Sequence, residues 1–173
     1  MALAGCLFAS PLSFAMDPMQ GSLVPATPYD SRLAQIGRLP DPSAPMPQIH
    51  SAESLFAQAK AFRYRKDAGN RDYWQTPQET ESRWTGDCED KAVWLFAQLK
   101  NNGYADARLV IGRENASSGR LHVWVVLLDN ASGGLLILDP TSQNRIWRSA
   151  DFPDGAYQAL YSFDGTRRWR HDA

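Results

Sequence analysis

The sequence predicts an α+β domain in which N-terminal helices pack on a mostly antiparallel sheet. Helical patterns occupy residues 51 to 103, and strand patterns follow between residues 107 and 165. One strand pattern, RLHVWVVLL at 120–128, is apolar on both faces, which is typical of a strand in the middle of a covered sheet. With 173 residues the chain is long enough for one domain with a sizeable core.

The first 16 residues resemble the hydrophobic region of a secretory signal, with SFA before Met16 as a small-x-small cleavage site. On this interpretation the protein is periplasmic or secreted. The stretch LAGC also matches a bacterial lipoprotein signal ending at Cys6, which would need an upstream start, and an ordinary buried N-terminal segment is a third interpretation. The apolar run ends at Ala15 and is too short to span a bilayer, so we expect no transmembrane segment.

Residues 17–50 are predicted to be a linker or a wrapping arm, which leaves 51–173 as the folded domain. Prolines recur through this stretch and leave little room for regular structure; they are Pro18, Pro25, Pro28, Pro40, Pro42, Pro45 and Pro47. Its position upstream of the domain would also permit the arm to cross a substrate cleft.

Three helices are predicted after the arm. Ser51 is a candidate N-cap for the first, whose apolar residues share one helical face: Leu55, Phe56, Ala59 and Phe62. The second is short and opens on Thr76 and Pro77, with Glu79 behind them.

The third helix has the strongest pattern. Asp87 can cap it, Asp90 stands three residues later as a capping-box acid, and Gly103 is available to end it. The buried stripe consists of Ala92, Val93, Leu95, Phe96 and Leu99. Cys88 therefore falls in the first turn of this helix.

The predicted strands lie at 107–114, 120–128, 133–140 and 156–165, separated by polar and glycine-containing loops. The C-terminal stretch GTRRWRHDA is a local basic cluster that we interpret as a solvated tail. A net charge of −1 gives no reason to expect nucleic acid or an anionic membrane as a partner. We expect a monomer.

His122 begins the second predicted strand, and Asp139 ends the third. If Leu128 and Gly133 flank the hairpin turn, antiparallel pairing places His122 directly opposite Asp139 on one face of the sheet. Their Cβ atoms would then lie about 4.5–5.5 Å apart, close enough for a carboxylate to orient an imidazole. The register is an assumption, because a bulge in the turn would shift it.

Cys88, His122 and Asp139 together have the groups that a nucleophilic triad needs. A thiol at a helix N-terminus is stabilised as thiolate, a histidine takes and returns the proton, and an aspartate holds the imidazole. The backbone N–H of Cys88 and a second donor, for which Trp84 is a candidate, would form the oxyanion hole. Taken singly, each residue also has an ordinary interpretation: a buried cysteine, a strand-end histidine and a turn aspartate.

Three segments resemble the bacterial transglutaminase-like cysteine peptidases, a family that includes periplasmic proteases releasing large adhesins from the cell surface. These segments are DYWQTPQETESRWTGDCEDKAVWLFAQL, LHVWVVL and LLILDPTS, and the GDCED core is specific. The resemblance implies a papain-like, transglutaminase-type core with Cys88, His122 and Asp139 as the catalytic triad. It also implies a protein or peptide substrate, such as a surface adhesin.

The acids around Cys88 allow two interpretations. The chemistry of the triad requires no cofactor, but the resemblance to the calcium-dependent, adhesin-releasing branch suggests Asp87, Glu89 and Asp90 as calcium ligands, and carboxylate oxygens suit Ca²⁺. Alternatively, Asp87 and Asp90 cap the helix while Glu89 favours its positive end, which needs no metal. Without a cation, the three carboxylates would oppose formation of the thiolate.

We therefore predict an exported cysteine protease, a hydrolase that works through a thioester at Cys88. The same acyl-enzyme could be resolved by an amine, which would make the protein a transglutaminase or an amidase. A catalytically idle relative that binds a peptide in the same cleft is the alternative from a different class.

Overall fold

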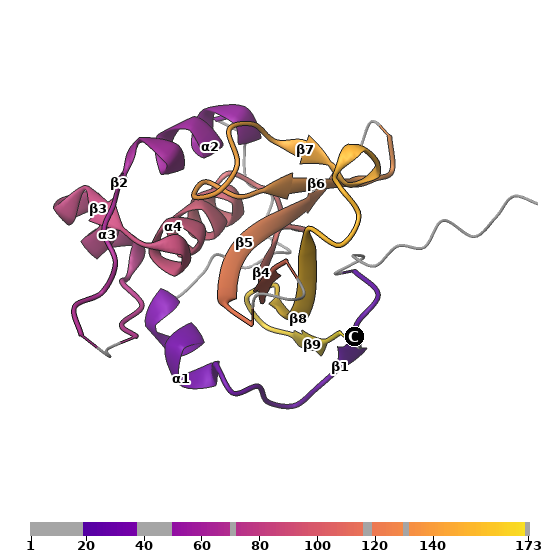
Figure 1. Ribbon diagram of the computed structural model, residues 1–173, viewed down its shortest axis with the longest axis horizontal. Coiled ribbons are helices and arrows are strands. Elements are labelled where there is room, and N and C mark those ends of the chain that lie inside the picture. Colours follow the sequence, from indigo (N-terminus) through magenta and orange to yellow (C-terminus); the bar gives the residue numbers. More distant parts are fainter. Residues whose placement is uncertain (1–18, 38–49, 70–71, 116–118, 130–131, 172–173) are drawn as a thin grey trace, which may run out of the picture.

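A seven-stranded sheet forms the centre of the structure, with strand order β1-β9-β8-β4-β5-β6-β7 and every neighbouring pair antiparallel (Figure 1). The structure is a computed structural model that describes residues 19–37, 50–69, 72–115, 119–129 and 132–171. The strands of the sheet are β1 (Ser22–Leu23), β4 (Arg108–Glu114), β5 (Leu121–Leu128), β6 (Leu135–Leu138), β7 (Trp147–Arg148), β8 (Tyr157–Phe163) and β9 (Arg168–Arg170). A second sheet pairs β2 (Arg63–Tyr64) with β3 (Thr85–Gly86) in parallel.

The helices are α1 (Asp30–Leu33), α2 (Ala52–Ala61), α3 (Pro77–Arg83) and α4 (Cys88–Asn101), with 3-10 turns η1 (Ala34–Ile36) and η2 (Ser149–Asp151). The predicted N-caps are confirmed. The Ser51 hydroxyl accepts a hydrogen bond from the Ser54 N–H, and Thr76 and Glu79 form a capping box in front of α3. Gly103 follows α4 with a φ of 80°, as the left-handed position after a helix requires.

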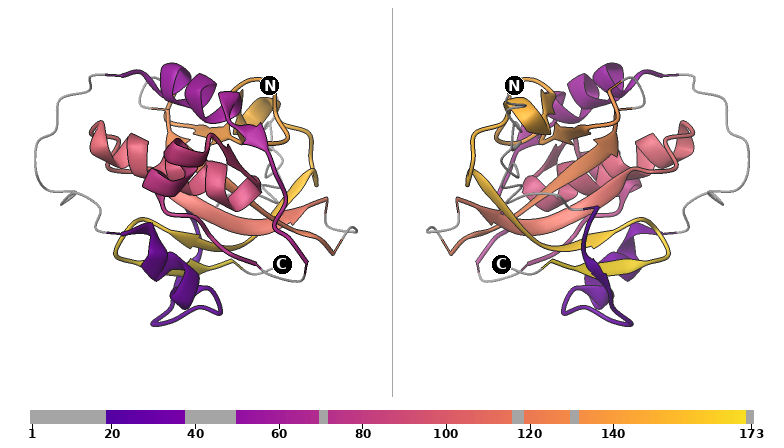
Figure 2. Two further views of the ribbon diagram at one scale, coloured as in Figure 1. Left: turned by 90° about the vertical axis from the view of Figure 1, so that its left-hand side faces the viewer. Right: turned by 90° about the vertical axis from the view of Figure 1, so that its right-hand side faces the viewer.

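The sheet is covered on both faces. One face of β5 joins α4 and α2 in the main core, and α3 packs on the outer side of α4 (Figures 1 and 2). The other face carries a second buried cluster made of Val110, Trp124, Val126, Ile137, Phe152, Tyr157 and Ala159. The predicted α+β class, with β5 as a strand buried on both faces, is therefore confirmed.

The predicted register of the β5–β6 hairpin is wrong by two residues. Leu128 pairs with Leu135 rather than with Gly133, because the turn is longer than the sequence pattern indicated and includes Gly134. The Asp129 N–H donates to the Gly134 carbonyl across this turn. A shift of two residues keeps each side chain on its predicted face, since the side-chain period of a strand is two.

The described part of the Pro-rich segment, residues 19–37, is integrated into the domain. β1 pairs with β9 at the sheet edge, and Leu33 and Ile36 are buried in the main core. Figure 1 shows this indigo segment passing beneath β8 and β9 and then reaching α1. Of the two predicted alternatives, this part of the chain behaves as a wrapping arm.

The interpretation of the C-terminal basic stretch as a solvated tail is wrong. Arg168–Arg170 form β9, in which Trp169 is 6% exposed. The Arg168 guanidinium donates to the Asp30 carboxylate at 2.8 Å, and that of Arg108 lies 3.7 Å from the centroid of the Trp169 ring. Trp169 is therefore packed into the sheet edge, and the guanidinium groups of Arg108 on β4 and of Arg167 lie over its indole.

The signal-like segment 1–16, including Cys6, lies outside the described residues. Within the described ranges, no helix combines the length and the apolar character needed to cross a bilayer.

Candidate active site

Cys88 is the first residue of α4, at the point where the short β2–β3 sheet meets the helix. The backbone N–H groups of this first turn have no intrahelical acceptor, so they favour negative charge near the thiol. Asp90 fixes the turn, since its carboxylate accepts hydrogen bonds from the backbone N–H of Asp87 at 3.2 Å and of Gln75 at 2.7 Å. The sequence-predicted capping box is therefore present, and Cys88 is held at 9% exposure.

His122, near the start of β5, and Asp139, directly after β6, meet in the buried interior. His122 Nε2 lies 2.6 Å from Asp139 Oδ2, and the two residues are 2% and 0% exposed. Asp139 follows the last residue of β6 and caps the next turn, accepting the backbone N–H groups of Thr141 at 2.8 Å and Ser142 at 3.0 Å. With Nε2 held in this way, Nδ1 is the ring nitrogen that can exchange a proton with a nucleophile.

The backbone after the histidine connects it to the cysteine. The backbone of Val123 hydrogen-bonds the Cys88 sulfur. Burial raises the pKa of the Cys88 thiol above its ordinary value, and so do the carboxylates of Glu89 and Asp87. These effects outweigh the hydrogen bond from Val123, which lowers that pKa. The thiol also donates to Glu89 Oε2 at 3.0 Å. The start of α4 and the start of β5 are therefore close together.

Tyr157 is a member of the site that the sequence did not identify. Its hydroxyl donates to Asp139 Oδ2 and accepts from Gln143 Nε2 at 3.1 Å, while Gln143 Oε1 accepts from Trp147 Nε1 at 3.1 Å. Burial raises the pKa of Asp139, but hydrogen bonds from His122, Tyr157 and Ser142 outweigh burial and hold that pKa below its usual value. The aspartate is therefore kept ionised, as a group that orients an imidazole must be.

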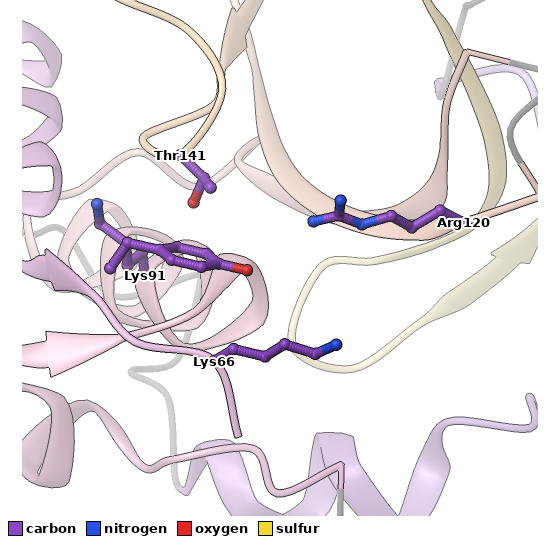
Figure 3. Close-up of a pocket in the computed structure, with 5 residues that line it drawn as sticks. Lys66, Lys91, Arg120 and Thr141 are labelled. Carbon is purple, nitrogen blue, oxygen red and sulfur yellow. The ribbon is translucent and has the colours of Figure 1, made fainter. Parts of the chain in front are cut away.

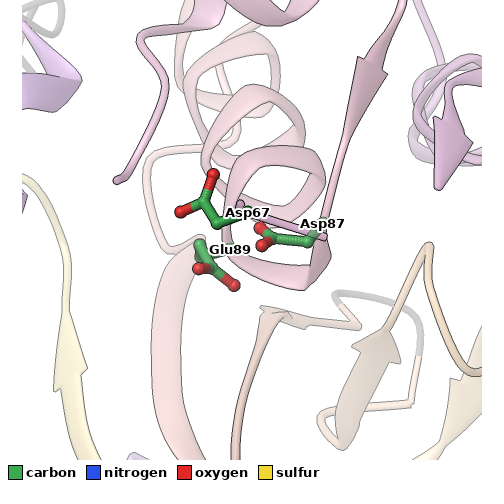
Figure 4. A group of neighbouring side chains, drawn as sticks. All are labelled: Asp67, Asp87 and Glu89. Atoms are coloured by element: carbon green, nitrogen blue, oxygen red, sulfur yellow. The ribbon is translucent and has the colours of Figure 1, made fainter. Parts of the chain in front are cut away.

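A cluster of three carboxylates lies beside the thiol, formed by Asp67, Asp87 and Glu89, whose oxygens come within 4.8 Å of one another (Figure 4). Asp67 was absent from the predicted ligand set. It comes from the chain after β2, which pairs with β3 and so runs beside Asp87. Asp87 Oδ1 is buried without a hydrogen-bond partner in the described part of the chain.

The assignment of Asp90 as a ligand in the same group is not supported by its position. Both of its carboxylate oxygens accept hydrogen bonds, including one from Gln75 Nε2 at 2.5 Å, and the residue is 0% exposed. Burial raises the pKa of both carboxyl groups, to about 8 for Asp87, where the charge of Glu89 adds to the effect, and to about 7 for Asp90. Asp90 is occupied as a helix cap. Three clustered oxygens with one orphaned buried acceptor form a donor set that suits a hard cation.

Trp84 is the C-cap of α3 and has a left-handed backbone with a φ of 54°. Its backbone N–H donates to the Thr80 carbonyl at 2.9 Å and is therefore engaged within α3. The indole is 52% exposed and packs edge-on against Phe62, with ring centroids 4.8 Å apart. Only the indole N–H could act as the oxyanion donor that the sequence suggested for this residue.

The chain resembles known proteins in sequence and in fold. Residues 72–163 match the sequence model of a family described as the CEP76 peptidase-like domain. EGTA-treated LapG of Legionella pneumophila superposes with a TM-score of 0.60 at 23% identity, over 70% of this chain and 66% of the LapG chain. Calcium-bound LapG of the same organism superposes with a TM-score of 0.58 at 23% identity, over 70% of each chain.

This chain thus spans just under two thirds of the length of EGTA-treated LapG. A comparison with curated proteins found no match. At this level of identity the structural likeness shows the fold, and the predicted papain-like core of transglutaminase-like peptidases is confirmed.

Proposed function

The chain belongs to the CEP76 peptidase-like domain family, and from this membership we propose that it is an exported cysteine peptidase cleaving peptide bonds of a protein substrate. The observation that supports this most is the buried hydrogen bond of 2.6 Å between His122 Nε2 and Asp139 Oδ2. Cys88, the first residue of α4, lies nearby. Following the resemblance of the sequence, we place the protein in the bacterial periplasm or outside the cell, with a surface adhesin as a candidate substrate.

In the proposed reaction, His122 Nδ1 takes the proton from Cys88, and the sulfur attacks the substrate carbonyl carbon. The carbonyl oxygen becomes an oxyanion, which the backbone N–H of Cys88 and the Trp84 indole N–H stabilise. The imidazolium then gives its proton to the leaving amine, so the C–N bond breaks and a thioester remains. Water, deprotonated by the neutral imidazole, hydrolyses the thioester and restores the thiol. Throughout, Asp139 holds the imidazole orientation and stabilises its positive charge.

Labelling of the thiol tests this proposal. With Ca²⁺ present to offset the carboxylates beside the thiol, Cys88 should react with iodoacetamide at neutral pH faster than the unfolded protein does, and His122→Ala should reduce the rate to that of the unfolded protein. Peptide mass spectrometry must locate the label, because Cys6 also carries a thiol. Rates equal to those of the unfolded protein in the wild type would instead favour an idle, peptide-binding relative.

The same protein preparations show whether the product of the reaction is a cleaved peptide or an amine adduct. Incubation with a peptide library should produce new amino termini, and Cys88→Ala should produce none. Incorporation of an added fluorescent amine, without new amino termini, would assign transglutaminase chemistry to the same thiol. Proteolysis that persists in Cys88→Ala would contradict the proposed nucleophile.

We also propose that Asp67, Asp87 and Glu89 hold a calcium ion, as the orphaned Asp87 oxygen and the family resemblance suggest. Calcium supplies positive charge, which would offset two of the carboxylates that oppose the Cys88 thiolate. Addition of Ca²⁺ should raise the melting temperature, and Mg²⁺ should do so less, because it demands a smaller octahedral site.

Glu89→Gln tests the proposed calcium ligands, and Asp90→Asn is its matched control. Glu89→Gln should abolish the calcium-dependent stabilisation measured by thermal unfolding. Asp90→Asn should lower stability with and without calcium while keeping the calcium-dependent shift, since Asp90 caps α4 instead of joining the cluster. A calcium shift that is lost in Asp90→Asn and kept in Glu89→Gln would contradict this ligand assignment.

A further inference from the structure

Gln143 makes four hydrogen bonds in the turn that follows β6. Its backbone N–H donates to the Asp139 carbonyl at 3.2 Å, and its carbonyl accepts from the Lys60 ammonium of α2 at 2.8 Å. Its side-chain amide lies between the Tyr157 hydroxyl and the Trp147 indole N–H, at 3.1 Å from each. Because the backbone and both ends of the amide are engaged, the position of this side chain is fixed.

The same turn forms part of a pocket with a volume of about 560 Å³, whose lining residues adjoin the candidate triad along the chain. Figure 3 shows Thr141 and Lys91 at this pocket. Lys91 lies three residues after Cys88, and the Thr141 N–H donates to Asp139 Oδ1 at 2.8 Å. A shift of the turn that Gln143 holds would therefore move the candidate aspartate.

Trp147 fixes the direction of the hydrogen bonds that lead to the candidate triad. An indole N–H is a donor only, so it requires the carbonyl oxygen of the Gln143 amide to face it. The amide nitrogen then faces Tyr157 and donates to its hydroxyl oxygen. The hydroxyl proton is consequently directed to Asp139 Oδ2, the oxygen that also lies 2.6 Å from His122 Nε2. A reversed amide would place its own oxygen against the hydroxyl and would compete with Asp139 for that proton.

The direction of the Tyr157 hydrogen bond affects the candidate histidine. A hydroxyl that donates to a carboxylate reduces the negative charge that the same oxygen offers to a second donor. When this donation is lost, Asp139 should bind the ring N–H of His122 more strongly. The imidazolium should then give up its proton less readily, because the carboxylate stabilises its positive charge more.

We propose that Gln143 is a positioning residue of the candidate triad: oriented by Trp147, it directs the Tyr157 hydroxyl to Asp139. The proposal rests on the proposed peptidase function, because in that reaction the imidazolium must pass its proton to the leaving amine. The amide of Gln143 acts through Tyr157 and not on the substrate. Its loss should therefore slow turnover and leave substrate binding unchanged.

Proton NMR of the His122 ring tests the proposal without a substrate. Gln143→Glu keeps the length of the side chain and an acceptor for Trp147, but its carboxylate cannot donate to Tyr157 at neutral pH. The hydroxyl should turn toward the introduced carboxylate, and the His122 Nε2–H resonance should move downfield, because its hydrogen bond to Asp139 strengthens. The resonance is identified by its absence from the spectrum of His122→Ala.

Trp147→Phe and Asn144→Asp are the matched comparisons. Trp147→Phe removes the indole N–H without a change of charge and keeps an aromatic ring against Phe152, so the amide can reverse and the resonance should again move downfield. Asn144→Asp adds the same negative charge as Gln143→Glu at the next residue, whose side chain accepts from Lys60 at 3.2 Å, and should leave the resonance in place. Equal shifts in the two charged variants, or an unshifted resonance in Gln143→Glu or Trp147→Phe, overturn the proposal. Trp147→Phe decides the question if Gln143→Glu does not fold.

Peptide cleavage by the same variants separates this proposal from the peptidase function. Gln143→Glu should lower kcat about tenfold with KM unchanged, the fold-change of one charge-assisted hydrogen bond, and Asn144→Asp should keep both values. A downfield shift in Gln143→Glu, in a protein whose wild type neither cleaves peptides nor labels rapidly at Cys88, would reject the peptidase and keep the hydrogen-bond chain. Cleavage by the wild type, with an unshifted resonance in Gln143→Glu, would reject the positioning role of Gln143 alone.

Discussion

Tyr157 connects the candidate triad to the core on the second face of the sheet. It is 2% exposed, and its ring packs on Trp124 with centroids 4.7 Å apart and on Phe152 at 5.0 Å. Its hydroxyl has two partners, Asp139 and Gln143. The position of the aspartate therefore depends on a side chain from a different strand, held rigidly by aromatic packing.

Tyr157→Phe should lower the free energy of unfolding by about 1–2 kcal/mol at pH 7, because it removes a buried donor to an ionised carboxylate. The pKa of Asp139 is depressed in the folded state, so its stabilising contribution is complete above its ordinary value of 3.8 and is lost as the pH falls through the folded pKa. The difference between the two proteins should shrink over that acid range in urea titrations.

Tyr161→Phe is the matched control for this prediction. Tyr161 lies on the same strand, is half-buried, and contacts the Tyr29 ring edge-on at 5.8 Å. Its loss of a hydroxyl should change stability by less than about 0.5 kcal/mol at every pH. Equal effects of the two substitutions would contradict a specific link between Tyr157 and Asp139.

The sequence predicted the residues of the site that form part of strong local patterns, but it did not predict those that tertiary structure brings in. Cys88 follows a capping residue, and His122 and Asp139 bound strands, so periodicity located them. Asp67 lies twenty residues before Asp87 and reaches it only because β2 pairs with β3. Strands of two residues leave no periodic signal, so Asp67 could not be inferred. The capping role of Asp90 could be, because its spacing from Asp87 is that of a capping box.

At the level of the secondary-structure elements, the close packing of β4 against its neighbouring strands constrains the surroundings of His122. Gly112 pairs with His122 on β5 and with Ala159 on β8, and the β8 register shifts between Ile111 and Gly112. A Cβ at this glycine would lie 2.1 Å from the Gln158 carbonyl oxygen and 2.6 Å from the Trp124 ring. The close approach of three strands beside the site therefore requires glycine.

Gly112→Ala should lower the free energy of unfolding by about 1–3 kcal/mol, because the backbone carbonyl of β8 cannot move aside without disrupting the ladder. Trp124 stacks on the imidazole of His122 with centroids 6.1 Å apart, so the variant should also slow iodoacetamide labelling of Cys88. Chemical denaturation and labelling rates provide the two measurements.

Gly134→Ala serves as the control for the β4 substitution. It is exposed in the β5–β6 turn, and an added Cβ would meet only the Ser132 hydroxyl oxygen, at 3.4 Å. Its effect should stay within about 0.5 kcal/mol. If the two alanine variants are equally stable, the close approach of strands at Gly112 does not constrain the sheet.

The same hairpin shows why the elements were predicted better than their registers. Alternating and continuous apolar patterns locate β4, β5, β6 and β8, whose bounds depend on local residue types. Register depends instead on how many residues the turn contains, and a glycine-rich turn fits several lengths. The prediction still placed His122 and Asp139 on one face, because the error was an even number of residues.

At the scale of the whole molecule, the N-terminal arm closes the sheet edge and contributes to the core. Tyr29 lies between Trp74, with ring centroids 6.4 Å apart, and Tyr161. The Asp30 carboxylate accepts from Arg168 on β9 at 2.8 Å, so the arm contacts the last strand of the sheet. Proline-rich composition predicted the lack of long elements here, but it could not show that isolated apolar side chains of the arm are buried.

Leu33→Ala and Leu23→Ala distinguish an integrated arm from a passive linker. Leu33 is 5% exposed in the main core, so its truncation should cost about 2–5 kcal/mol of unfolding free energy. Leu23, on the same arm, is 65% exposed, and its truncation should change stability by less than about 0.5 kcal/mol. Urea denaturation of the two variants measures both values. A single cooperative transition for Leu33→Ala, shifted to lower urea, would show that the arm unfolds with the sheet and therefore that the candidate site depends on it. If the urea transition of Leu33→Ala is unchanged from that of the wild type, residues 19–37 act as a linker.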